Sequence, residues 1–316
     1  MTETQCQSPI VSLETRVVRY ADLKPCFSAF IDSRTPGSDR KENFTIIGPG
    51  VSENPEQFVH ICDAHGFNIG AARQPPGCVN SQHSHDTAEV FVVHSGEWRF
   101  DFGEHGEDAQ VYAGPGDVLS FPVHVFRGFA NIGKNSEPGF LWAVLGGDDP
   151  GRVTWAPKVF ELAVEHGLVL LENGALIDTA AGEQVPPDAC VMPPTTEATV
   201  AALRRLTPEE AEQAIARTAD IAGPGERLVI GANALLDPVG GFTLSRVELA
   251  PGDEVVGRPA APEVLFMHRG DAEVSVGDEA VVLGEGDTMT MPLGLLRRFA
   301  TQTGAVMFVV RGFEAN

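Results

Sequence analysis

Short runs of β-branched and aromatic residues, separated by Gly, Pro and Asp, dominate two parts of the chain. Runs of this length, bounded by turn residues, are typical of β-strands. Several such strands in succession are typical of a sandwich or barrel. The pattern predicts strands in the first part at residues 90–93, 98–102, 117–121 and 140–145, and in the second part at residues 264–267, 272–276, 287–291 and 306–310.

The stretch between these two parts has a different pattern. Residues 156–166 have helical periodicity, and residues 195–206 are rich in Ala and Leu. Residues 207–210 form a capping box with proline at the first helical position, which predicts a helix that continues to about Ile221. The expected fold class is therefore all-β with a helical connector.

The two strand-rich parts are copies of one unit. A first block of positions, Glu89, Val90, His94 and Gly96, recurs 174 residues later, and a second block, Gly116, Asp117, Pro122, Arg127 and Phe129, recurs 170 residues later. The difference of four residues falls in the loop between the blocks, where length is tolerated. Self-similarity of this kind predicts two related barrels rather than one large domain.

The first copy contains a candidate metal site. His83, His85 and Glu89 have the same parity along a predicted strand, so their side chains can point to the same interior. Two imidazoles and one carboxylate suit Fe(II), Mn(II), Ni(II) or Zn(II). We therefore expect these three residues to bind a divalent transition metal, and the residue types alone leave all four of these metals open.

Residues 77–96 have the spacing Gly-x5-His-x-His-x3-Glu-x6-Gly, which matches the first motif of the cupin superfamily. Residues 116–131 resemble its second motif. Together with the repeat, the chain resembles a bicupin, which has two tandem jelly-roll β-barrels. This resemblance implies four segments: an N-terminal arm at 1–59, a metal-binding cupin domain at 60–150, a helical connector at 151–225 and a degenerate cupin domain at 226–316.

Two residues of the second motif depart from the family pattern. Arg127 stands where the family usually has a further His ligand, and His124 stands where it usually has Gly. A guanidinium cannot bind a metal, so either the site is a three-ligand triad or His124 serves as a fourth ligand. Arg127 is a candidate catalytic residue that pairs with a substrate carboxylate or enolate. Alternatively, it bridges strands through backbone hydrogen bonds.

The second copy has lost the ligands. Arg258 and Ala260 stand near the histidine positions, and Arg297 replaces the later His. We therefore expect no divalent metal in this barrel, which would serve as a scaffold, a dimer surface or a lid.

Charge and cysteine content limit the expected binding partners and the expected cellular compartment. Lys and Arg number 22 against 44 Asp and Glu, giving a formal net charge of −22, which argues against nucleic acid and anionic membranes as main partners. The five cysteines include no C-x-x-C pair, which favours a reducing compartment. With no signal-like start and no apolar run of about 18 residues, the sequence predicts a cytoplasmic protein.

The resemblance implies a metal-dependent bicupin oxidoreductase, a non-haem Fe(II) dioxygenase of a small aromatic or enolisable oxygenated substrate. It suggests an enzyme that is quercetinase-like or gentisate-dioxygenase-like. The alternatives are a metal-dependent isomerase, epimerase or lyase, and a non-catalytic cupin that binds a small molecule. A small-molecule substrate and a homodimer are the expected partners. The sequence has no phosphate-binding Gly-rich loop, no G-x-S-x-G and no H-E-x-x-H, so kinase and hydrolase functions have no support.

Overall fold

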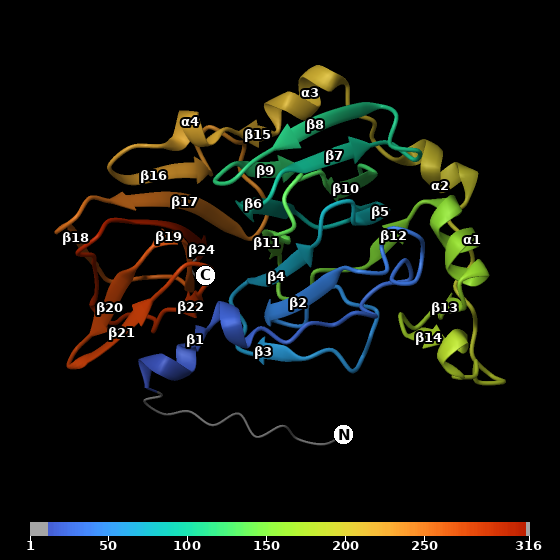
Figure 1. Cartoon of the computed structure of the whole chain (residues 1–316), viewed down its shortest axis with the longest axis horizontal. Helices are drawn as coiled ribbons and strands as arrows, with labels where there is room; N and C mark the ends of the chain where they lie inside the picture. Colours follow the sequence, from blue (N-terminus) through green and yellow to red (C-terminus); the bar gives the residue numbers. More distant parts are fainter. Residues whose placement is uncertain (1–11, 314–316) are drawn as a thin grey trace. The chain divides into compact units, whose positions relative to one another are not determined.

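Figure 1 shows the computed structural model of the chain, in which most regular structure is β-sheet and residues 12–313 are described. These residues divide into two units. The first unit comprises residues 24–222 and 228–244 and contains the His-x-His motif. The second unit comprises residues 12–23, 223–227 and 245–313. The predicted all-β fold class with a helical connector is confirmed.

Two large sheets and one small sheet build the first unit. The seven-stranded sheet has the order β15 (Ile215–Ala216), β9 (Val118–Phe121), β6 (Glu89–Ser95), β11 (Gly139–Gly146), β4 (Phe67–Gln74), β2 (Glu42–Ile47) and β3 (Val59–Ile61). The five-stranded sheet has the order β12 (Val153–Trp155), β5 (Val79–His85), β10 (Arg127–Asn131), β7 (Trp98–Phe102) and β8 (Ala109–Ala113). The small sheet pairs β13 (Leu168–Leu170) with β14 (Leu176–Asp178).

An aromatic core holds the first unit together. Along β7, Trp98, Phe100 and Phe102 are fully buried, whereas the two residues between them are partly exposed. The alternation follows from the pleat of a strand, which sends successive side chains to opposite faces. Phe91 of β6 packs against Phe100 with ring centroids 5.5 Å apart. Burial of each such aromatic side chain stabilises the fold by about 1.5–3 kcal/mol.

The connector contains short helices and strands. Its helices are α1 (Pro157–Glu165), the 3-10 turn η3 (Thr179–Ala181), α2 (Glu197–Ala202), α3 (Pro208–Gln213) and α4 (Thr218–Ile221). The capping box at the start of α3 is confirmed, because the Thr207 side chain accepts from the Glu210 backbone and the Glu210 side chain accepts from the Thr207 backbone.

The prediction of one helix from Pro208 to about Ile221 is wrong. The chain leaves the helix after Gln213 and forms β15, in which Ile215 pairs with Leu119 of β9. Ile215 belongs to the aromatic core cluster. Helix propensity is a weak preference that tertiary packing overrides, and burial of this short strand ends the helix.

The segment predicted as an arm is part of the first unit over residues 24–59. Its strand β2 pairs with β4, and residues 151–222 of the connector lie in the same unit. The structure therefore groups these segments differently from the four predicted domains. Residues 1–11 of the predicted arm lie outside the described residues. Within residues 12–313, no helix has the length and apolar character needed to cross a membrane.

The second unit repeats the two-sheet plan. Its larger sheet has the order β1 (Val17–Val18), β22 (Thr288–Thr290), β19 (Glu263–Gly270), β24 (Ala305–Gly312), β17 (Phe242–Leu249) and β16 (Gly225–Ile230), of which β17 belongs to this unit from residue 245 and β16 up to residue 227. Its smaller sheet has the order β18 (Glu254–Gly257), β23 (Arg297–Ala300), β20 (Ala272–Val276) and β21 (Glu279–Leu283). Two 3-10 turns, η1 (Leu13–Arg16) and η2 (Tyr20–Asp22), precede and follow β1.

A buried ion cluster lies inside the second unit. Glu263 is fully buried, and Arg297 donates to both of its oxygens, at 2.8 Å to Oε1 and 3.0 Å to Oε2. Arg311 donates to Oε2 at 2.7 Å. Both carboxylate oxygens of Glu263 are therefore used by guanidinium groups.

We expect Glu263→Ala to lower the free energy of unfolding by about 3–5 kcal/mol, because it leaves buried guanidinium charge without its partner. Glu254→Ala is the matched control, since Glu254 pairs with Arg298 at the exposed surface. Its loss should be less than about 1 kcal/mol. Urea unfolding measures both, and equal losses would contradict the structural role of Glu263.

Candidate metal centre

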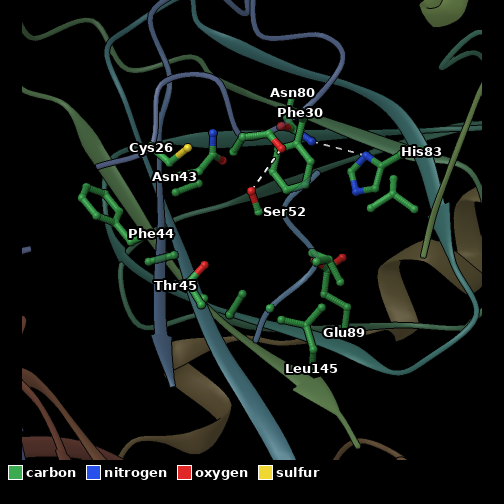
Figure 2. A pocket seen from close by; sticks show the side chains of 18 of the residues that line it. Cys26, Phe30, Asn43, Phe44, Thr45, Ser52, Asn80, His83, Glu89 and Leu145 are labelled. Atoms are coloured by element: carbon green, nitrogen blue, oxygen red, sulfur yellow. Dashed lines mark hydrogen bonds between the residues drawn. The ribbon is translucent and has the colours of Figure 1, made fainter. Parts of the chain in front are cut away.

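Strands β5 and β6 bring the three predicted ligands together. His83, His85 and Glu89 are buried, and their candidate ligand atoms all lie within 4.8 Å of one another. His83 and His85 point inward from alternate positions of β5, and Glu89 begins β6. Figure 2 shows His83 and the Glu89 carboxylate on the wall of one cavity. Within residues 12–313, these three residues form the one group of neighbouring His, Cys, Asp or Glu side chains that could hold a metal ion.

Both imidazoles are neutral at pH 7. Burial, together with the neighbouring His85 and Arg127, lowers the pKa of His83 to about 3. Burial and Arg127 also hold the pKa of His85 well below its usual range. His83 Nδ1 lies 2.8 Å from the Ser81 carbonyl oxygen, which accepts a proton held on Nδ1. This tautomer leaves the Nε2 lone pair of His83 available to a metal.

The two oxygens of Glu89 have different partners. Oε2 accepts from Arg127 Nη2 at 2.7 Å and from Arg127 Nε at 3.2 Å. Oε1 lies 3.6 Å from His85 Nε2. The carboxylate therefore offers one oxygen on the side of the histidines, while the other is held by the guanidinium.

Arg127 is buried beside the triad. Besides its two bonds to Glu89, it donates from Nη1 to the Val125 carbonyl oxygen at 3.2 Å. The side chain is not part of the cavity wall. Its observed partners are thus a side chain and a backbone oxygen, which makes Arg127 a positioning residue for Glu89. The catalytic contact with substrate that the sequence suggested stays a prediction.

His124 does not join the triad. Its side chain is exposed to solvent, while its backbone N–H donates to the His85 carbonyl oxygen at 2.9 Å. Its φ of 59° lies in the left-handed region. Glycine adopts that conformation most easily, which explains why the family usually has Gly here. The geometry gives no support to His124 as a fourth ligand, because the turn that it forms directs its side chain away from the site.

The residues present fit a divalent transition metal. Two neutral imidazoles and one carboxylate oxygen are a donor set typical of Fe(II), Mn(II) and Zn(II) sites. His85 Nδ1 is buried and has no hydrogen-bond partner within residues 12–313. A buried polar atom of this kind is uncommon in native proteins and often marks a functional site.

The triad opens into a cavity of about 80 Å³ in the first unit. Much of its wall comes from residues that the sequence analysis did not identify as part of a site. They come from residues 26–57, from strands β4, β5, β10 and β11, and from β12, and include Cys26, Phe30, Asn43, Phe44, Thr45, Ser52, Gln57, Asn80, Phe129, Leu145, Val153 and Trp155. No periodic sequence pattern marks them, because several lie in loops and β12 is only three residues long.

Trp155 closes the cavity beside the histidines. Its ring centroid lies 5.4 Å from that of His83, and β12 places it opposite His83 on β5. Its Nε1 donates to Glu53 Oε1 at 2.7 Å. Glu53 Oε2 accepts from the Ile31 backbone at 2.7 Å. Burial raises the pKa of Glu53 to about 8, although both hydrogen bonds oppose the shift.

The equivalent place in the second unit is filled. Arg127 faces His83 across β10 and β5, and Arg297 faces Gly257 across β23 and β18. Gly257, rather than Arg258 or Ala260, is therefore the cross-strand counterpart of His83. A Cβ at Gly257 would lie 2.5 Å from Arg297 Nη1. The guanidinium of Arg297 thus occupies the space that the Cβ of a histidine at position 257 would need.

Comparisons agree with this architecture. The cupin domain family model matches residues 71–143. Lactobacillus farciminis oxalate decarboxylase has 12% identity, covers 98% of this chain and 88% of its own, and has a TM-score of 0.56. A Bacillus subtilis oxalate decarboxylase variant has 12% identity, coverage of 97% and 79%, and a TM-score of 0.57. At such identities the likeness concerns the fold. No curated protein matches the sequence.

We expect purified wild-type protein to carry one divalent transition metal per chain and His83→Ala to carry less than about a tenth of that, because the variant lacks one of three ligands. His105→Ala is the control, since His105 is exposed and lies outside the triad. Elemental analysis of both variants measures the effect. Equal metal content in His83→Ala and wild type would contradict the assignment.

The raised pKa of Glu53 predicts that the free energy of unfolding depends on pH. Its pKa is raised from 4.5 to about 8 on folding, so between these values the folded state holds a proton that the unfolded state releases. The free energy of unfolding therefore falls as pH rises through this window. Glu53→Gln cannot titrate and should lack this fall. Melting temperatures of both proteins from pH 5 to pH 8 test it, and parallel profiles would show the prediction to be wrong.

Proposed function

We propose that the chain, whose residues 71–143 match the cupin domain family model, is a metal-dependent oxidoreductase of the two-barrel cupin type. The specific activity proposed is that of a non-haem Fe(II) dioxygenase of a small aromatic or enolisable oxygenated substrate. The observation that carries this proposal is the His83, His85 and Glu89 triad on the wall of an aromatic-lined cavity. The fold alone supports many functions, so the argument rests on the site.

The triad has the composition of the facial triad of non-haem iron oxygenases, two histidines and one carboxylate. Iron held by three protein ligands supplies open coordination positions for a chelating substrate and for dioxygen. Arg127 holds one oxygen of Glu89 and so keeps the other on the side of the histidines. The Ser81 carbonyl fixes the His83 tautomer. The protein residues thus hold the donor set in one protonation state and one orientation.

The cavity wall favours a planar, oxygenated substrate. Phe30, Phe91, Phe129 and Trp155 provide aromatic faces and edges against which a ring packs. Asn43 also lines the cavity, and its Nδ2 is buried without a hydrogen-bond partner in the described part of the chain. A substrate oxygen at that place would satisfy it. A small hydrophilic dianion such as oxalate would gain little from the aromatic walls.

Charge balance favours an anionic ligand. The cation Arg127 is paired with Glu89, and Lys41 is paired with Asp32, both inside the first unit. The two histidines are neutral because burial lowers their pKa values. A divalent ion at the triad would therefore add positive charge to a buried, mostly apolar site. Buried charge is costly unless it is paired, so a catecholate or enolate oxygen is the complementary ligand.

We expect Fe(II)-loaded protein to consume oxygen with at least one substrate among catechols, gentisate-like acids and β-diketones, measured with an oxygen electrode. Ala72→Leu adds three carbons beyond the alanine Cβ on the cavity wall and should lower the rate at least about tenfold. Overpacking costs about 1–3 kcal/mol, so metal content and melting temperature are measured in parallel.

The matched control is the same substitution at the exposed Ala280 of the second unit, which should keep the wild-type rate. Full activity in Ala72→Leu would show that the substrate does not bind in this cavity. Turnover of a screened compound without oxygen uptake would replace the dioxygenase by a metal-dependent isomerase or lyase.

A further inference from the structure

Asn80 lies three residues before His83, an odd spacing that puts two side chains on opposite faces of a regular strand. The strand is not regular here. Arg127 pairs with His83 and Phe129 pairs with Asn80, so two residues of β5 lie opposite one residue of β10. This β-bulge turns Asn80 to the same face as His83, and Asn80 lines the cavity. Bulges next to active sites commonly re-aim a side chain in this way.

Gly128 makes room for the bulge. A Cβ at this position would lie 2.1 Å from Gln82 Oε1 and 2.8 Å from the Asn80 carbonyl oxygen. The second unit has no bulge at the equivalent place, because β18 and β23 pair without a shift. Val255 there faces Phe299, as Asn80 faces Phe129. The bulge and its polar residue therefore occur in the unit that has the triad.

A buried ion pair fixes the orientation of the Asn80 amide. Lys41 and Asp32 form a salt bridge with both side chains fully buried. Lys41 Nζ also donates to Asn80 Oδ1 at 2.9 Å. Asp32 Oδ2 in turn accepts from the Ser81 backbone N–H at 3.0 Å, which ties the pair to the bulge. Because an ammonium group only donates, the Asn80 oxygen must face Lys41 and the amide nitrogen must face away from it.

Among residues 12–313, the amide nitrogen then has no acceptor. Asn80 Nδ2 lies 3.3 Å from His83 Nδ1, a contact marked in Figure 2. In the tautomer that leaves His83 Nε2 free, Nδ1 carries the proton that the Ser81 carbonyl accepts. Two donors cannot bond each other. The Nδ2 protons are therefore available to an acceptor in the cavity beside the triad.

We infer that Asn80 is a substrate-binding residue that donates a hydrogen bond to an anionic oxygen of the ligand, and that Lys41 with Asp32 is its positioning pair. This inference rests on the proposed function and assigns its substrate class more narrowly. The favoured ligand has an enolate, phenolate or carboxylate oxygen next to the chelating position, which a hydrogen-bond donor recognises and a hydrocarbon wall does not.

The test is binding of 4-nitrocatechol to Fe(II)-loaded protein under anaerobic conditions, followed by its absorption, with metal content measured on each sample. Asn80→Asp keeps the shape and the bond to Lys41 but replaces the N–H donor by an acceptor. We expect its Kd to rise about 10- to 100-fold, the effect of one hydrogen bond to a charged group, with unchanged metal content.

Asn135→Asp is the matched control. Asn135 is exposed and lies outside the cavity wall, so the same substitution there should change the Kd by less than about twofold. Asp32→Asn with Lys41→Met removes the positioning pair without leaving a buried charge. We expect that double variant to raise the Kd about 3- to 10-fold, since the amide loses its fixed orientation.

The outcomes separate the two proposals. Wild-type protein that holds no metal or binds no 4-nitrocatechol would overturn the proposed function. Wild-type binding together with an unchanged Kd in Asn80→Asp would overturn the inference and leave the proposed function standing. Equal weakening by Asn80→Asp and Asn135→Asp would also overturn it, because the added negative charge, rather than the lost donor, would then explain both. An unchanged Kd in the double variant would remove Lys41 and Asp32 from the assignment.

Discussion

A buried glutamate–arginine pair recurs inside both units, and the candidate site depends on how the glutamate uses its oxygens. In the first unit Arg127 holds Oε2 of Glu89, which leaves Oε1 on the side of the histidines. In the second unit Arg297 and Arg311 use both oxygens of Glu263. A buried charge without its partner is costly, so the pair is retained even where no metal ligand surrounds it. The same interaction therefore supports a site in one unit and fills it in the other.

The sequence predicted most of the strands and the proximity of His83, His85 and Glu89, because both follow from short-range rules. The alternation along a strand fixed the shared face of His83 and His85, and the structure brings both together with Glu89. The partner of Arg127 was missed, although the repeat contained the signal. Glu89 and Arg127 recur together as Glu263 and Arg297 in a copy without the histidines. A Glu–Arg pair that is present even in the copy without the histidines does not depend on the metal ligands. Its recurrence could therefore have indicated that the two side chains contact each other.

The cavity walls could not be predicted from the sequence. Phe30 and Asn43 come from the segment that the sequence predicts as an N-terminal arm, and Trp155 comes from a three-residue strand. These residues meet the triad through long-range pairing, which periodicity does not report. Asn80 was missed for a different reason. The parity rule that found His83 and His85 places Asn80 on the wrong face, and only the register shift at β10 corrects this.

The net charge of −22 is compatible with the proposed preference for an anionic substrate, because surface charge and the charges of the site act over different distances. At physiological ionic strength the Debye length is about 8 Å, so exposed carboxylates are largely screened beyond that distance. Inside the cavity, screening is weak and local charges decide binding. There the two buried cations, Lys41 and Arg127, are each matched by a carboxylate. We therefore expect the acidic surface to repel polyanions that need an extended contact, whereas the binding of a single small anion should depend mainly on the donors and the metal ligands of the site.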